Sequence, residues 1–323
     1  MFGKNLFGKK KTESTSAPLG VRLSDLMSLL APTTLKAAIV GNTLIAQHEQ
    51  YKVTVEVIPP EVRETEDGPI RAVVRIKSGF PKAILDQLGG KLEGLPAALN
   101  GFAALGAVTC EGKEIYVGSR LTIYESEDAW RTLHLPILLF TIISGSEPIL
   151  GGFRRALGSQ PPRAGRSNWT EGDFEVAHSM LSRVCLCTIG GLGLTAEFGL
   201  SGGSMSAVVG HTDTALFQMA ADQPHPEFGG GLFCLLQLPH ELPDEKHLEA
   251  VCAKLNQLEM KAIGLPPHFG AWCAGKRGNN PAYVCFIPNA LHSVSEIALN
   301  AAFWAMNRAR LANTMLAEMG VRA

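Results

Sequence analysis

LNGFAALGAVTCEGKEIYVGSRLTIY (residues 99–124) and KLNQLEMKAIGLPPHFGAWCAGKRGNNPAYVCFI (residues 254–287) decide the fold, because both stretches follow one template. Each begins where a helical run closes on Leu-Asn, continues through a short apolar segment and a polar turn, and enters a second apolar segment. A long apolar region follows in both cases. One supersecondary unit that occurs twice predicts two similar domains in one chain.

Outward from these stretches, both halves show the same order of predicted elements. In the first half, apolar periodicity predicts a helix over 21–31, a second short helical piece at 33–40, strands within 42–58 and at 70–77, and a glycine-weakened helical region over 81–104. In the second half it predicts a helix from 170 to about 188, strands near 193–200, 213–220 and 231–238, and helices over 244–260 and 295–319. An antiparallel sheet covered by helices satisfies this order, so the expected class is α+β.

Composition sets the boundaries of the two domains. GSQPPRAGRSN (158–168) combines two prolines, two glycines and two arginines with almost nothing apolar, which is typical of an exposed linker. The predicted domains are therefore 21–157 and 169–323. Residues 1–20 carry lysines and small polar residues without an apolar period, which predicts a disordered tail. An alternative role for this tail is contact with a membrane surface or an acidic partner.

Charge and cysteine usage argue against several classes of protein. The formal net charge of −1 gives no field that would attract nucleic acid. The seven cysteines lie mostly in apolar runs, and no secretory signal precedes them, so a cytoplasmic location is expected. The spacing of the cysteines and histidines fits no metal site, and we expect neither metal nor cofactor. The apolar stretch 133–150 is interrupted by His134, Pro136 and SGSEP, so a buried helix with a break is favoured over an integral membrane span.

Two short motifs resemble a catalytic site and a nucleotide-binding site. Gly199-Leu-Ser-Gly-Gly203 matches the G-x-S-x-G pattern of a serine hydrolase, with Ser201 as the nucleophile, but that motif needs a helix directly after the turn. A glycine-rich hairpin turn explains it better, and a hydrolase that uses Ser201 remains the alternative function. Gly270–Lys276 resembles a phosphate loop, but Arg277 stands where a serine or threonine is required.

Large apolar side chains are the remaining signal. The region around Trp130, Leu135 and Phe140 is more apolar than one helix face can bury, and Phe303 and Trp304 repeat this in the second half. These five residues are candidate partner-binding residues. The alternative is that they pack in the core.

LNGFAALGAVTCEGKEIYVGSRLTIYESEDAW (99–130) and KLNQLEMKAIGLPPHFGAWC…YVCFIPNAL (254–291) resemble the type III secretion chaperones and the related YbjN-like proteins of bacteria. The resemblance covers most of 21–157 and 169–319, one copy each, and rests on apolar positions. It implies a non-enzymatic module that holds an extended segment of an unknown partner protein along sheet and helix surfaces. It also implies pairing of such domains, as a homodimer or as a pseudo-dimer within one chain.

Overall fold

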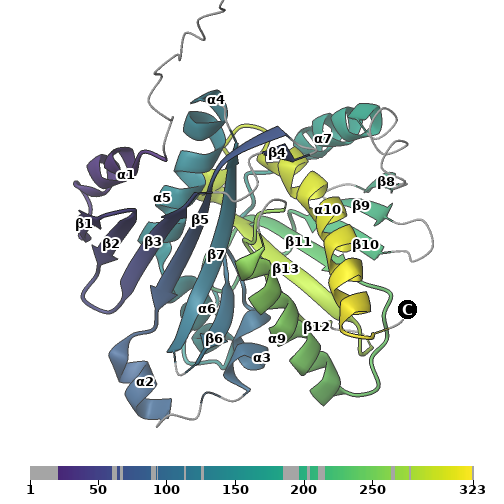
Figure 1. The fold of residues 1–323 in the computed structure, drawn as a ribbon. Coiled ribbons are helices and arrows are strands. Elements are labelled where there is room, and N and C mark those ends of the chain that lie inside the picture. The colour runs from purple at the N-terminus through teal and green to yellow at the C-terminus, as the bar shows by residue number, and fades with distance from the viewer. Residues whose placement is uncertain are drawn as a thin grey trace, which may run out of the picture.

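The computed structural model shows an α+β fold with two antiparallel sheets flanked by helices, as the sequence predicts (Figure 1). It describes residues 21–321 except 60–63, 66–67, 89–91, 93, 113, 125–126, 185–195, 202–203, 210–214, 263–265 and 276–277. The predicted tail over 1–20 lies outside the described residues.

The first half builds a seven-stranded sheet in the order β1-β2-β3-β5-β7-β6, with the short β4 paired to β5. Its strands are β1 (Lys36–Val40), β2 (Thr43–Gln47), β3 (Lys52–Ile58), β4 (Glu64–Thr65), β5 (Gly68–Gly79), β6 (Ala107–Glu111) and β7 (Glu114–Tyr124). Its helices are α1 (Leu23–Leu30), α2 (Lys82–Leu88), α3 (Leu95–Asn100), α4 (Glu127–Ala129), a π-helical turn η1 (Trp130–His134), α5 (Leu135–Ser144) and α6 (Glu147–Ala156).

The second half builds a six-stranded sheet in the order β8-β9-β10-β11-β13-β12, which repeats the path of the first sheet. Its strands are β8 (Ala196–Ser201), β9 (Ser204–Val209), β10 (Ala215–Ala220), β11 (Gly231–Gln237), β12 (Ala271–Ala274) and β13 (Pro281–Pro288). Its helices are α7 (Glu171–Val184), α9 (Glu245–Lys261), the short 3-10 helix η3 (Asn289–Leu291) and α10 (Ile297–Glu318). The segment 158–168 between the halves has neither helix nor strand and is mostly exposed.

One predicted element is wrong. Residues 33–40 were expected to be helical, whereas 36–40 form strand β1. A two-residue turn at Gly41-Asn42 joins β1 to β2, and Gly41 has a φ of +59°, which glycine adopts without strain. Pairing with β2 overrides the helical preference of the alanines in Lys36-Ala-Ala-Ile-Val40.

An asparagine of the central helical region, Asn100 at the end of α3 and Asn256 within α9, binds the following strand in each half. Val108 N donates to Asn100 Oδ1 at 2.7 Å, and Asn100 Nδ2 donates back to Val108 O at 3.2 Å. Trp272 N donates to Asn256 Oδ1, and Asn256 Nδ2 donates to Trp272 O, both at 2.9 Å. The Leu-Asn that marks the template therefore satisfies a buried backbone amide and carbonyl at the start of β6 and of β12.

The halves meet through reciprocal main-chain contacts. Arg120 N of β7 donates to His268 O at 3.0 Å, and His268 N donates to Arg120 O at 2.7 Å. In the matching place, Phe286 N of β13 donates to Ala104 O at 3.2 Å. Ala104 lies four residues before Val108, which Asn100 binds, and His268 lies four residues before Trp272, which Asn256 binds. In each half, the segment before the short strand (β6 or β12) thus contacts the long strand of the other half (β13 or β7).

Candidate functional site

The free edge of the first sheet is the most accessible strand surface that the structure describes. β1 pairs with β2 on one side, and among the described strands none pairs with its other side. Four of its five residues are exposed, including Ile39 at 38% and Val40 at 64%. An exposed edge strand offers unpaired backbone donors and acceptors to a second chain.

The hairpin geometry shows which backbone groups of β1 face outward. In a two-residue hairpin the residues that flank the turn, here Val40 and Thr43, form a hydrogen-bonded pair, and such pairs alternate along the strand. The backbone groups of Ala37 and Ile39 therefore face away from β2. They are the groups that an added strand would bind.

Helix α1 flanks this edge and adds apolar surface to it. Leu23, Leu26 and Leu30 anchor α1 in the core, whereas Met27 and Leu29 are 38% and 43% exposed. Half of the large apolar side chains that the described residues expose lie on α1 and β1. We call Met27, Leu29, Ile39 and Val40 the β1 edge surface.

The five residues predicted to bind a partner do not form one surface. Trp130 is 1% exposed and its indole Nε1 donates to Asp25 Oδ2 at 3.3 Å, so it lies beneath α1 in the core. Leu135, Phe140, Phe303 and Trp304 are partly buried against the same core. Trp130 therefore packs in the core, which was the alternative to partner binding.

Trp304 lines a largely apolar cavity of about 40 Å³ at the junction of the halves. Ile137 of α5 lies on one side of this cavity, and Phe217 and Cys285 of the second sheet lie on another. The ring of Trp304 lies 6.0 Å from that of Phe269. The cavity has room for a few water molecules, which makes it too small for a drug-sized ligand.

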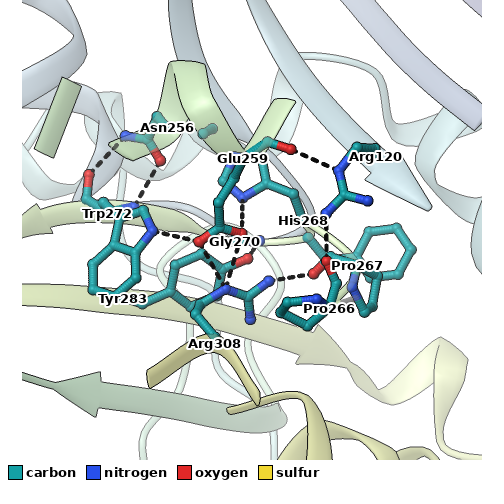
Figure 2. Close-up of polar contacts among 12 residues, drawn as sticks. Arg120, Asn256, Glu259, Pro266, Pro267, His268, Gly270, Trp272, Tyr283 and Arg308 are labelled. Atoms are coloured by element: carbon teal, nitrogen blue, oxygen red, sulfur yellow. Dashed lines mark hydrogen bonds and ion pairs between the residues drawn. The ribbon is translucent and has the colours of Figure 1, made fainter. Parts of the chain in front are cut away.

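A buried carboxylate, Glu259 of α9, is the centre of a polar cluster that the sequence did not reveal (Figure 2). Its oxygens accept hydrogen bonds from Trp272 Nε1 at 2.6 Å and from Arg308 Nε at 3.1 Å, and His268 Nδ1 lies 3.2 Å away. The guanidinium of Arg308 also lies 3.7 Å from the centre of the Tyr283 ring. Three side chains from other parts of the second half, His268, Trp272 and Arg308, therefore converge on one carboxylate.

Arg120 connects the first sheet to this cluster. It is fully buried, and its Nε donates to the main-chain oxygen of Glu259 at 2.6 Å, while one Nη donates to Pro266 O at 2.5 Å. These carbonyls lie at and just after the C-terminal end of α9, where the helix macrodipole favours a positive charge. Arg120 therefore fixes α9 of the second half on β7 of the first.

The electrostatics of this cluster follow from its burial. Burial by itself raises the pKa of Glu259, but the charge of Arg308 and the hydrogen bonds from His268 and Trp272 outweigh it and lower the pKa to about 2. Burial lowers the pKa of Arg120 to about 10 and also lowers the pKa of His268, in both cases against the opposing charge of Glu259. The buried groups satisfy one another's charges and hydrogen bonds, and the cluster stabilises the contact between the halves.

Among the described residues, no helix follows Ser201 as a nucleophile elbow would require. β8 ends at Ser201 and the next element is strand β9, with Ser201 opposite Ser204 in the antiparallel register. A nucleophile elbow requires a turn from strand to helix. The Gly270–Lys276 segment likewise contains strand β12, which pairs with the antiparallel strand β13, and Lys276 is outside the described residues.

The described part of the chain contains no group of three or more histidine, cysteine or acidic side chains placed to hold a metal ion. Within that part, no single helix has the length and apolar character needed to cross a bilayer. Trp130–Ser144 and Glu147–Ala156 reach that length only as a pair bent by 56°.

Neither the free β1 edge nor the Glu259 cluster was predicted. The Gly41-Asn42 turn between two apolar runs is a hairpin signal that could have revealed β1. The chain matches no family model, and no curated protein or solved structure is significantly similar to it.

Proposed function

We propose that the protein is a non-enzymatic binding module, of chaperone or adaptor type, that holds an extended segment of a partner protein on the β1 edge surface. The observation that carries this proposal is an edge strand with exposed apolar side chains and an unpaired outer side among the described residues. Strand addition to such an edge gives affinity through main-chain hydrogen bonds and specificity through alternate side chains.

Natural proteins protect exposed edges with charges, prolines or bulges. β1 has a charged residue only at its start, Lys36, and continues as Ala-Ala-Ile-Val without a bulge in its pairing with β2. An edge left open in this way supports a role in binding. The resemblance of 99–130 and 254–291 to secretion chaperones supports the same class of function, with the two halves paired inside one chain as the subunits of a dimer would be.

The test compares matched variants in an affinity pull-down of the tagged full-length protein from its native host. Ile39→Lys with Val40→Lys places charges on the edge without removing a β1–β2 hydrogen bond, and Ile39→Pro removes one outward donor. Val176→Lys, at a 61% exposed position on α7, is the control.

We expect a stoichiometric partner that the wild type and the Val176→Lys variant retain and that both edge variants lose. Circular dichroism of each variant checks that it is folded. Equal retention by all variants, or the absence of any stoichiometric partner, would contradict the proposal.

A further inference from the structure

A polar pocket of about 260 Å³ lies between the outer face of the first sheet and the C-terminal turn of α9. Alternation along β5 places Val74 and Ile76 in the core beneath the helices and Arg75 and Lys77 on the opposite face. Lys261 of α9 forms another wall of the pocket. The site is therefore assembled from both halves.

Positive charge predominates in this pocket. Arg75, Lys77 and Lys261 line it together with a single carboxylate, Glu111. Glu111 Oε2 is already bound, by Lys77 Nζ at 2.6 Å and by the hydroxyl of Tyr116 at 3.2 Å. Among the described residues, neither Arg75 nor Lys261 forms an ion pair, although Glu56 lies opposite Arg75 in the β3–β5 register and the charge of Lys261 acts on Glu111. The lining still has three positive side chains against one carboxylate.

Arg75 has an unused donor at this site. Its Nε is buried and has no hydrogen-bond partner among the described residues, and one Nη makes only a long contact of 3.4 Å to Lys261 O. A buried donor without an acceptor costs free energy. A guanidinium presents paired donors that match two oxygens on one centre, as in a phosphate or a carboxylate.

One neighbouring charge, that of Arg120, adds to the preference for an anion. Arg120 lies directly opposite Arg75 in the β5–β7 register, and its own donors are engaged by α9 carbonyls and Thr122. Arg120 therefore adds positive potential beside the pocket without competing for a ligand there. An adjoining cavity of about 470 Å³ is lined by Lys52 and Lys77 and by one carboxylate, Glu114.

We propose that this pocket binds a small anionic molecule through a phosphate or carboxylate group held by Arg75, Lys77 and Lys261. The volume and the wall that α9 supplies favour a compact ligand over a chain segment, and the adjoining cavity gives space for the rest of the molecule. This site is separate from the β1 edge surface, and its test does not depend on the proposed function.

The experiment is isothermal titration calorimetry of the full-length protein with pyrophosphate, inorganic phosphate and citrate, at an ionic strength held constant with sodium chloride. We expect saturable binding, one molecule per chain, of at least one of these probes. The phosphate and citrate arms distinguish a phosphate ligand from a carboxylate ligand.

Lys261→Gln and Lys246→Gln form a matched pair, because both lysines lie on α9 and Lys246 is exposed in its first turn, away from the pocket. We expect Lys261→Gln to weaken binding by about tenfold, as for the loss of one charge-assisted hydrogen bond, and Lys246→Gln to leave it unchanged. Arg75→Lys keeps the charge but loses the paired donors, and should also weaken binding.

If Arg75→Lys does not fold, the lysine pair decides the question alone. Three outcomes would overturn the proposal: no saturable binding of any probe, equal weakening by both lysine variants, or binding of a poly-glutamate peptide without binding of any small anion.

Discussion

Arg75 and Arg120 lie directly opposite one another on β5 and β7, and both donate to main-chain carbonyls at the C-terminal end of α9. Like charges in opposite positions on neighbouring strands normally destabilise a sheet. Here the carbonyls of Glu259 and Lys261, with the negative end of the α9 macrodipole, offset the repulsion. Arg120, whose bonds to Glu259 O and Pro266 O are short and buried, thereby anchors the second half on the first sheet, and Arg75 adds one long contact.

Replacement of Arg120 by methionine should lower the free energy of unfolding by about 3 kcal/mol, because it leaves Pro266 O without its donor and removes the shorter of the two hydrogen bonds to Glu259 O. Urea unfolding followed by circular dichroism measures the change. Arg166→Met, at an exposed position of the linker, is the matched control and should stay within about 0.5 kcal/mol of wild type. A similar small effect for both variants would contradict the role of Arg120.

Glu259→Gln should cost about 3–5 kcal/mol at neutral pH, because it leaves Arg308 and Arg120 buried without a negative charge. The free-energy cost of this substitution depends on pH. The folded-state pKa of Glu259 is lowered from 4.5 to about 2, so its stabilisation is fully present above pH 4.5 and is lost as the pH falls toward 2.

The difference in unfolding free energy between wild type and Glu259→Gln should therefore shrink below about pH 4.5. Urea titrations at successive pH values give this difference directly. A difference that stays constant down to the lowest pH at which the protein folds would contradict a lowered pKa, because it would show that folding does not shift the pKa of Glu259.

His134→Leu should stabilise the protein, and increasingly so in acid. His134 is 3% exposed, and neither ring nitrogen has a partner among the described residues. Burial lowers its pKa from 6.5 to about 4, so the unfolded chain binds a proton in this range that the folded chain does not, and wild-type stability falls as the pH drops through it.

Between about pH 6.5 and pH 4 the advantage of His134→Leu should grow by up to about 1.4 kcal/mol per pH unit. Chemical unfolding at pH 7.5, 6 and 5 measures this slope. His247→Leu, at an exposed position on α9, is the control for the exchange of a histidine for a leucine. Parallel pH profiles for wild type and His134→Leu would contradict burial of a neutral histidine.

Asn100→Ala and Asn256→Ala should each cost about 2 kcal/mol, because each leaves a buried backbone amide and carbonyl unpaired. Thermal or urea unfolding measures both. Similar costs are expected because the two side chains make the same pair of hydrogen bonds. Asn300→Ala, at a position on the final helix with one local hydrogen bond, should cost less. A large difference between the first two variants would mean that the two asparagines are not equivalent.

Periodicity in the sequence predicted most helices and strands of this protein. The alternation of Val53 and Val55 predicts β3, and the spacing of Leu248, Cys252 and Leu255 predicts α9; the structure buries all five. The α+β class follows from these local patterns. β1 was mistaken for a helix because Ala37 and Ala38 favour a helix when read alone, whereas its pairing with β2 depends on the turn that follows.

The candidate site could be predicted only in part. Trp130 is large and apolar, but the sequence does not say which surface covers it, and α1 with Asp25 covers it in the fold. The accessible apolar residues Ile39 and Val40 belong to an edge, and whether a strand is an edge depends on the complete order of the sheet.

The sequence by itself determined the class of the fold and the repeated unit around Asn100 and Asn256, because these depend on residues a few positions apart along one helix or strand. The tertiary structure alone decided that Arg120 reaches Glu259, 139 residues away, and that Arg75 lies beside it under α9. Contacts between polar side chains at such separation have no period in the sequence. They arise only when two sheets, each shaped by its own local pattern, pack against one another.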